Sequence, residues 1–79
     1  MSTMTASVTR QFEGPGGERA MLQYDHYERS EFYSHQVRFV PPGDDMPLVV
    51  HRSAKLEAAR RVWSRIEREL MDAGLSPVK

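Results

Sequence analysis

The feature that most constrains this chain is one amphipathic segment in its last third, residues 54–73. Apolar side chains recur there at spacings of three and four, which is the period of one face of an α-helix. They are Leu56, Ala59, Val62, Trp63, Ile66, Leu70 and Ala73. Trp63, at the middle of this stripe, is expected to anchor the core. A helix with one apolar face must bury it against a second layer, so the rest of the chain has to provide that layer.

Residues at both ends of this segment are typical of helix termini. Ser53 precedes it and is a favourable N-cap, because a serine hydroxyl can accept a hydrogen bond from an N–H group of the first turn. Gly74 follows it, at the position where a glycine commonly takes a left-handed conformation, and Pro77 comes shortly after. The sequence therefore predicts a helix that ends at Ala73.

Alternation of apolar and polar residues in the first two-thirds of the chain predicts the second layer, because a half-buried strand has a period of two. The alternating segments are residues 7–12, 19–27 and 32–40, and a shorter apolar strand at residues 48–51 follows with its pairing open. We therefore expect an α+β fold: a small antiparallel sheet of three to four strands, packed on one face by a single C-terminal amphipathic helix. The domain is expected to span residues 1–79, with residues 1–6 and 75–79 flexible.

The glycine-rich residues 14–17 lie between the first two expected strands. A phosphate-binding loop would need a lysine with a serine or threonine and would open a helix, whereas here a strand follows and no lysine is near. A hairpin turn is the better interpretation, because glycine takes positive φ freely. This turn places Phe12 opposite Ala20.

The pairing of the second and third expected strands follows from the same alternation, since a one-residue slip would turn every side chain to the other face. A loop of four residues pairs Tyr27 with Phe32 and places Leu22 opposite Val37. The face toward the helix is then mostly apolar, and the opposite face is mixed.

Composition argues against several classes of protein. The chain has 79 residues and no cysteine, which rules out disulfides and thiolate metal sites within it. Eleven basic residues balance eleven acidic ones, so the basic surface typical of nucleic-acid binders is not expected. Because no signal peptide and no apolar run of membrane-spanning length can be recognised, we expect a cytoplasmic protein that does not enter a membrane.

Three histidines are candidate metal ligands: His26, His35 and His51. Their spacings match no common ligand motif. The predicted register places His26 near Tyr33 and His35 near Tyr24, so we expect both to border the apolar face. A catalytic triad of Ser34, His35 and Asp25 fails on geometry, because neighbouring residues of a strand point to opposite faces. We therefore predict no metal, no cofactor and no enzymatic activity.

The outer face of the expected helix carries three arginines, Arg61, Arg65 and Arg68. They form an alternative ligand face, which could bind RNA or an acidic ligand weakly. Each arginine has an acidic residue four positions away, and such pairs ordinarily support a solvated helix. Those acidic residues are Glu57, Glu69 and Asp72.

The sheet face that points away from the helix is the predicted protein-binding surface. One helix covers only one face of a sheet, and Tyr, Met and Arg are enriched at protein interfaces. The residues of this predicted surface are Met21, Tyr27, Phe32, Gln36 and Arg38. The hypothesis from these residues is a small, non-enzymatic accessory or regulatory protein that binds another protein or a second copy of itself.

Three motifs and Gly74 carry a resemblance to short proteins of cyanobacteria, in which a few strands are followed by one helix containing a tryptophan. The motifs are Glu28-Arg29-Ser30-Glu31-Phe32-Tyr33, Val49-Val50-His51-Arg52-Ser53 and Ala59-Arg60-Arg61-Val62-Trp63. The resemblance includes no catalytic motif. It implies a cytoplasmic location and a small accessory role.

Overall fold

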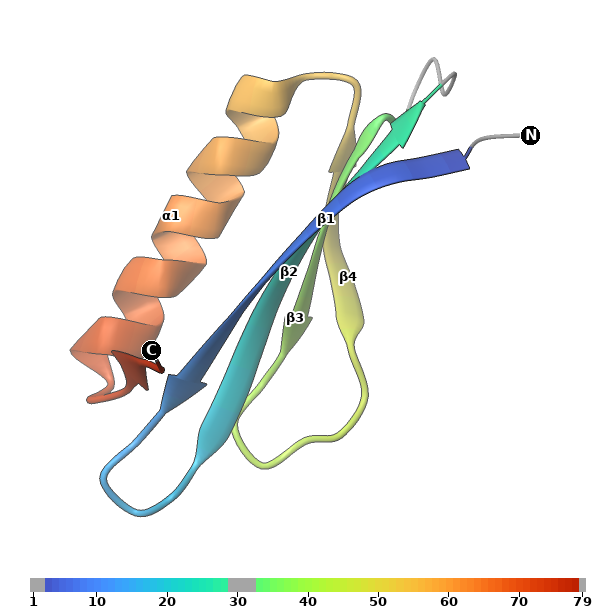
Figure 1. Ribbon diagram of the computed structural model, residues 1–79. Helices are drawn as coiled ribbons and strands as arrows, with labels where there is room; N and C mark the ends of the chain where they lie inside the picture. Colours follow the sequence, from blue (N-terminus) through green and yellow to red (C-terminus); the bar gives the residue numbers. More distant parts are fainter. Residues whose placement is uncertain (1–2, 29–32, 79) are drawn as a thin grey trace.

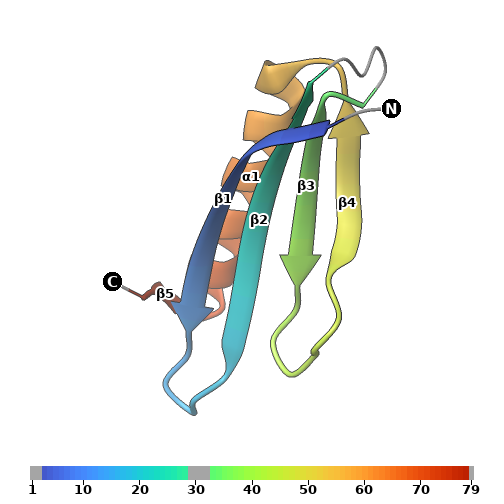
Figure 2. The ribbon, with the colours of Figure 1, turned by 45° about the vertical axis from the view of Figure 1, so that its right-hand side comes forward.

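An antiparallel sheet and one helix form the two layers of the molecule (Figure 1). The computed structural model describes residues 3–28 and 33–78. The elements are β1 (Thr3–Glu13), β2 (Arg19–Glu28), β3 (His35–Val40), β4 (Leu48–Ser53), α1 (Leu56–Asp72) and β5 (Ser76–Pro77). The five strands of the sheet follow the order β4-β3-β2-β1-β5, as Figure 2 shows for the four longer ones. The α+β class with one C-terminal helix is confirmed, and β5 is an addition to it.

The hydrophobic core lies between the helix and the sheet. Phe12, Leu22 and Val37 are fully buried, one from each of β1, β2 and β3. The helix and the segment after it add Ala59, Ile66, Leu70 and Leu75. Trp63 is only partly buried and packs at the side of this cluster, so the expectation that it anchors the core is wrong. The buried helix residues lie in both halves of α1: Ala59 is 1% exposed, and Ile66 and Leu70 are 7% and 5% exposed.

The β1–β2 hairpin has the predicted register, with Phe12 opposite Ala20. Its turn closes with a hydrogen bond from the N–H of Gly14 to the carbonyl oxygen of Glu18, 2.8 Å long. Gly17 has a φ of 85°, a conformation in which a side chain would be strained. The hairpin interpretation of the glycine-rich segment is thus confirmed.

The predicted β2–β3 register is wrong by two residues. Leu22 lies opposite Phe39 and Tyr24 opposite Val37. Tyr27 donates its backbone N–H to the carbonyl oxygen of Ser34, 2.8 Å away, so it is not paired with Phe32, a residue outside the described part of the chain. A slip of two residues leaves every side chain on its own face, so the apolar pattern could not distinguish the two registers.

The two edges of the sheet are formed by β4, whose pairing the sequence leaves open, and by β5, which the sequence does not predict. β4 pairs with β3 at one edge, and the pairing shifts register between Val37 and Arg38. At the other edge β5 pairs with β1, where Pro77 lies opposite Phe12 and the N–H of Val78 donates to the carbonyl oxygen of Gln11. Strand pairing thus enters both terminal segments that the sequence marked as flexible, since β1 begins at Thr3.

The helix begins two residues later than predicted, and its N-cap is Lys55, which makes no side-chain capping bond. Ser53 is therefore not the N-cap. Its hydroxyl instead accepts a hydrogen bond from the N–H of Lys55 and donates one to the carbonyl oxygen of the same residue. Only residues 54–55 lie between the end of β4 and the start of α1. The two hydrogen bonds of Ser53 with Lys55 stabilise this short turn.

The C-terminal end of the helix agrees with the sequence. Gly74 has a φ of 95°, and the N–H of Leu75 donates to the carbonyl oxygen of Leu70 over 3.0 Å. This pattern is the Schellman motif, which satisfies the last carbonyls and reverses the chain. The reversal brings Leu75 into the core and leads to β5. In the described part of the chain, no helix has the length and apolar character needed to cross a membrane.

Candidate functional site

A buried carboxylate stands at the centre of the sheet face that the helix does not cover. Asp25 is 0% exposed. Its Oδ1 accepts hydrogen bonds from Ser7 Oγ at 2.9 Å and Gln23 Nε2 at 3.0 Å. Its Oδ2 accepts from Arg38 Nε at 3.0 Å and from Gln36 Nε2 at 3.4 Å. This polar network joins β1, β2 and β3 through one side chain.

The network continues to the edge of the sheet. Arg52 on β4 donates its Nε to Gln36 Oε1, 2.8 Å away. Four strands are therefore tied together by side-chain hydrogen bonds on the open face. Both carboxylate oxygens of Asp25 accept hydrogen bonds, and none of the residue's surface is exposed. The carboxylate therefore links neighbouring strands and is not accessible to a substrate from solvent.

The predicted protein-binding residues are distributed differently from the expectation. Gln36 is buried and Arg38 is bound to Asp25, so neither is a free polar group of the predicted surface. Met21 and Tyr27 are half-buried on the same face, and Met21 lies opposite Val40. Phe32 lies outside the described residues. The backbone N–H of Tyr27, which was expected to pair with Phe32, bonds to the carbonyl oxygen of Ser34.

The outer edge of β4 is a second candidate surface. Leu48, Val49 and Val50 are three consecutive aliphatic residues with exposed fractions of 53%, 45% and 41%. In the described part of the chain, β4 has β3 as its only neighbour in the sheet, so its other edge offers unpaired backbone groups (Figure 2). The sequence signal was present, since an apolar run without alternation does not fit a half-buried strand, but the pairing that exposes it could not be inferred.

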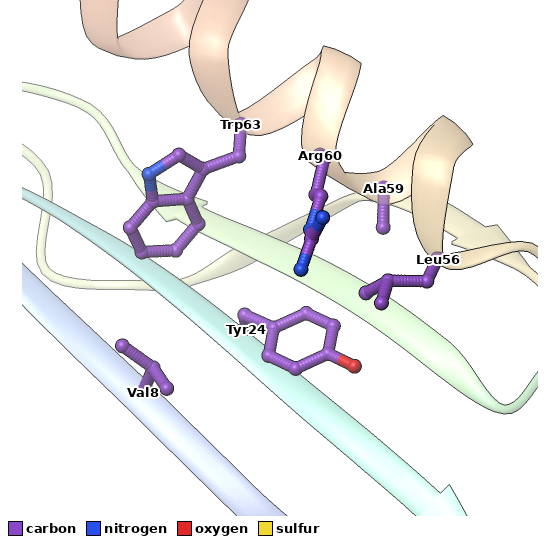
Figure 3. Close-up of a pocket in the computed structure, with 6 residues that line it drawn as sticks. All are labelled: Val8, Tyr24, Leu56, Ala59, Arg60 and Trp63. Carbon is purple, nitrogen blue, oxygen red and sulfur yellow. The ribbon is translucent and has the colours of Figure 1, made fainter.

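A cavity of about 270 Å³ lies between the first half of α1 and the sheet (Figure 3). Its lining residues are Val8, Tyr24, Leu56, Ala59, Arg60 and Trp63. The cavity exists because the backbone of α1 lies closest to β3 and β4, which leaves Val8 on β1 54% exposed although it points to the helix side. In Figure 3 the Arg60 side chain reaches from the helix into the space between Tyr24 and Trp63.

The polar groups beside this cavity form a short chain. Tyr24 Oη and His35 Nδ1 share a hydrogen bond of 2.6 Å, and the His35 ring stacks on His26 with 5.0 Å between ring centroids. Burial raises the pKa of Tyr24, and the positive charge of Arg60 opposes that rise. Burial also lowers the pKa of His35, with a further decrease from His26. The expected proximity of His35 and Tyr24 is confirmed. His26, which was expected near Tyr33, lies opposite His35 instead.

The helix arginines lie where the sequence placed them. Arg61, Arg65 and Arg68 border a shallow hollow on the outer side of α1, together with Arg60, Ser64 and Glu69. The ion pairs expected within the helix are not formed: the described residues contain two ion pairs, Arg10 with Glu67 at 2.6 Å and Arg38 with Asp25 at 3.0 Å. The three outer guanidinium groups are thus not neutralised by close contacts.

Comparison with known proteins gives no guide to the function. No family model, no curated protein and no solved structure matches this chain. Over residues 3–28 and 33–78, no three histidine, aspartate or glutamate side chains are grouped so that they could hold a metal ion. The candidate sites are therefore the open sheet face, the β4 edge, the helix arginines and the cavity, and the choice among them depends on their geometry.

Proposed function

We propose that this chain is a cytoplasmic, non-enzymatic accessory protein that binds another protein through the outer edge of β4. The observation that carries the proposal is the exposure of Leu48, Val49 and Val50 on a strand with one unpaired edge. The resemblance to short cyanobacterial proteins implies the same kind of role and stays a prediction.

An exposed apolar edge is unusual in a protein that acts alone. Natural edge strands commonly carry lysine, proline or inward-pointing charges that prevent another strand from pairing. No such residue lies within Leu48–Val50, and Pro47 directly precedes the run. Met46, two residues before Leu48, is 75% exposed. A partner strand added here would satisfy the free N–H and C=O groups and bury the aliphatic side chains at the same time.

The register shift beside Val50 limits how such an edge can be used. One extra residue of β4 sits between the pairs Val37–His51 and Arg38–Val49. A bulge bends and twists a strand, which disfavours repeated edge-to-edge pairing of sheets, as in aggregation. The edge is therefore suited to a single matched partner strand, from another protein or from a second copy of this chain.

The test compares two exposed valines. Val49→Lys places a charge at the β4 edge, and Val78→Lys is the matched control, because the two valines are 45% and 46% exposed. We expect wild type to form a dimer by light scattering, or to retain a defined partner in cross-linking from the native organism. Val49→Lys should abolish that association and Val78→Lys should preserve it. Both variants should melt close to wild type, since exposed substitutions usually change stability by about 0.5 kcal/mol or less.

Two results would contradict the proposal. One is a wild-type chain that stays monomeric at high concentration and retains no partner. The other is equal loss of association in both lysine variants. If Tyr27→Ser destroys binding while Val49→Lys does not, the open sheet face first predicted is the interface instead.

The helix arginines support a second candidate, weak binding of RNA or another acidic ligand. The specific observation is that Arg61, Arg65 and Arg68 form no close ion pair in the described structure. Such binding should weaken steeply with added salt, because each contact with a polyanion releases counterions. Arg61→Glu combined with Arg65→Glu should abolish it, and Val49→Lys should leave it unchanged.

A further inference from the structure

We propose that the cavity between α1 and the sheet binds a small carboxylate with an apolar tail. The tail would lie against Trp63, Val8 and Leu56, and the carboxylate would bind the guanidinium group of Arg60. This site is separate from the β4 edge and does not depend on the protein-binding proposal.

The walls of the cavity favour an apolar occupant. Val8 and Leu56 are 54% and 39% exposed, although both belong to the helix–sheet interface, and the indole of Trp63 borders the same space. Covering these groups removes apolar surface from water, which favours binding in proportion to the area covered. The volume of about 270 Å³ is at the low end for ligand pockets, so the occupant is a small molecule rather than a peptide.

The positive charge of Arg60 determines which polar head group a ligand of this cavity can carry. Arg60 points into the cavity from α1 (Figure 3), and among the described residues no acidic side chain forms an ion pair with it. The lining includes no aspartate or glutamate, so a cationic ligand would meet the positive charge of Arg60 and no carboxylate to offset it. A single guanidinium matches a carboxylate, which it can hold through two parallel hydrogen bonds.

The polar groups next to Arg60 support this arrangement. The charge of Arg60 acts on the hydroxyl of Tyr24, where it opposes the increase in pKa that burial causes. The Tyr24 hydroxyl is already bonded to His35 at 2.6 Å, so it contributes a fixed ring wall and leaves Arg60 as the anchor for the ligand. The alternative is that the cavity is an unselective packing gap, and charge selectivity distinguishes the two.

Trp63 makes the test direct, because it is the single tryptophan of the chain and lines the cavity. Its fluorescence would be titrated with octanoate and with 1-octanol, an uncharged molecule of the same chain length. We expect a saturable change with octanoate and a much weaker one with octanol. Arg60→Gln should weaken octanoate binding roughly tenfold or more, as expected for a hydrogen bond to a charged group, and leave octanol unchanged.

Arg61→Gln is the matched control, because Arg61 is the next residue on the same helix and borders the outer hollow instead. It should leave octanoate binding unchanged, and thermal melts should show that both glutamine variants fold. Equal binding of octanoate and octanol, no saturable response, or equal losses in the two variants would each overturn the proposal. Val49→Lys should retain octanoate binding, so failure of the β4 proposal would not affect this one.

Discussion

The two faces of the sheet bury side chains by different means. On the covered face, Phe12, Leu22 and Val37 are excluded from water by the helix above them. On the open face no second layer exists in the described structure, yet Asp25 is equally buried because neighbouring side chains surround it. The comparison shows that a residue alternating toward the open side need not be available to a partner.

The two kinds of burial respond differently to change. Apolar contacts are non-directional, so a core tolerates substitutions of similar volume. A buried polar network depends on every partner, because one lost hydrogen bond leaves a desolvated group unsatisfied. In the described part of the chain no buried side-chain nitrogen or oxygen lacks a partner, so the network is complete as it stands.

The covered face should give the largest single loss. Phe12→Ala is expected to reduce the free energy of unfolding by about 3–5 kcal/mol, because it removes a fully buried aromatic ring. That is comparable to the whole stability of a domain this small, so circular dichroism should show a largely unfolded chain. Val8→Ala, on the same strand and face but 54% exposed, should cost about 1 kcal/mol or less. Similar melts for the two variants would contradict the described core.

A substitution on the open face that removes a charge should reduce the free energy of unfolding almost as much. Arg38→Gln leaves the carboxylate of Asp25 without its cation and is expected to cost about 2–3 kcal/mol, somewhat less than for a fully buried pair because Arg38 is 29% exposed. The double change Arg38→Gln with Asp25→Asn removes both charges and should recover about 1 kcal/mol or more of that loss. Urea unfolding of wild type and of these two variants measures the differences in free energy. If the double variant is less stable than Arg38→Gln, the ion pair of Arg38 with Asp25 is not what stabilises the polar network.

Trp63 should have an intermediate effect. Its position at the middle of the apolar stripe predicts the core anchor, but it is half-buried beside the cavity. We therefore expect Trp63→Ala to cost about 2 kcal/mol, below the range for a fully buried tryptophan, and to leave a cooperative thermal transition. Complete unfolding of this variant would mean that the cavity is closed in solution.

The smallest expected effect is a pH dependence on the covered face. Burial and the neighbouring His26 lower the pKa of His35 below its ordinary 6.5, so the unfolded chain binds a proton more readily than the folded one. This contribution to stability is complete above pH 6.5 and is lost as the pH falls from there toward the lower folded-state pKa. Chemical denaturation between pH 7.5 and 5 should show His35→Gln with a flatter profile than wild type. An unchanged slope would contradict the role of His35.

The sequence identifies many residues of the candidate sites, but it does not show which other residues they contact. Alternation places Gln36, Arg38 and Tyr27 on the face away from the helix, as the structure has them. Their hydrogen bonds with Asp25 or with the backbone of Ser34 depend on which residues lie opposite one another. Arg60 is a further arginine of the helix, next to Arg61, and nothing in the sequence pattern distinguishes it. Its placement in the cavity depends on how the helix axis crosses the sheet, which no periodicity encodes.

Local periodicity by itself determined to which face the alternating residues of the first three strands point, where the helix ends and how the first hairpin closes. These features depend on neighbours close in the chain, such as Gly74 after the apolar stripe and the glycines of the turn before Arg19. The tertiary structure alone decided the two-residue shift between β2 and β3, the edge positions of β4 and β5, and the meeting of Ser7, Asp25 and Arg38. The physical reason is that a shift by two keeps both faces intact, so the apolar pattern is the same in either register and only packing across strands selects between them.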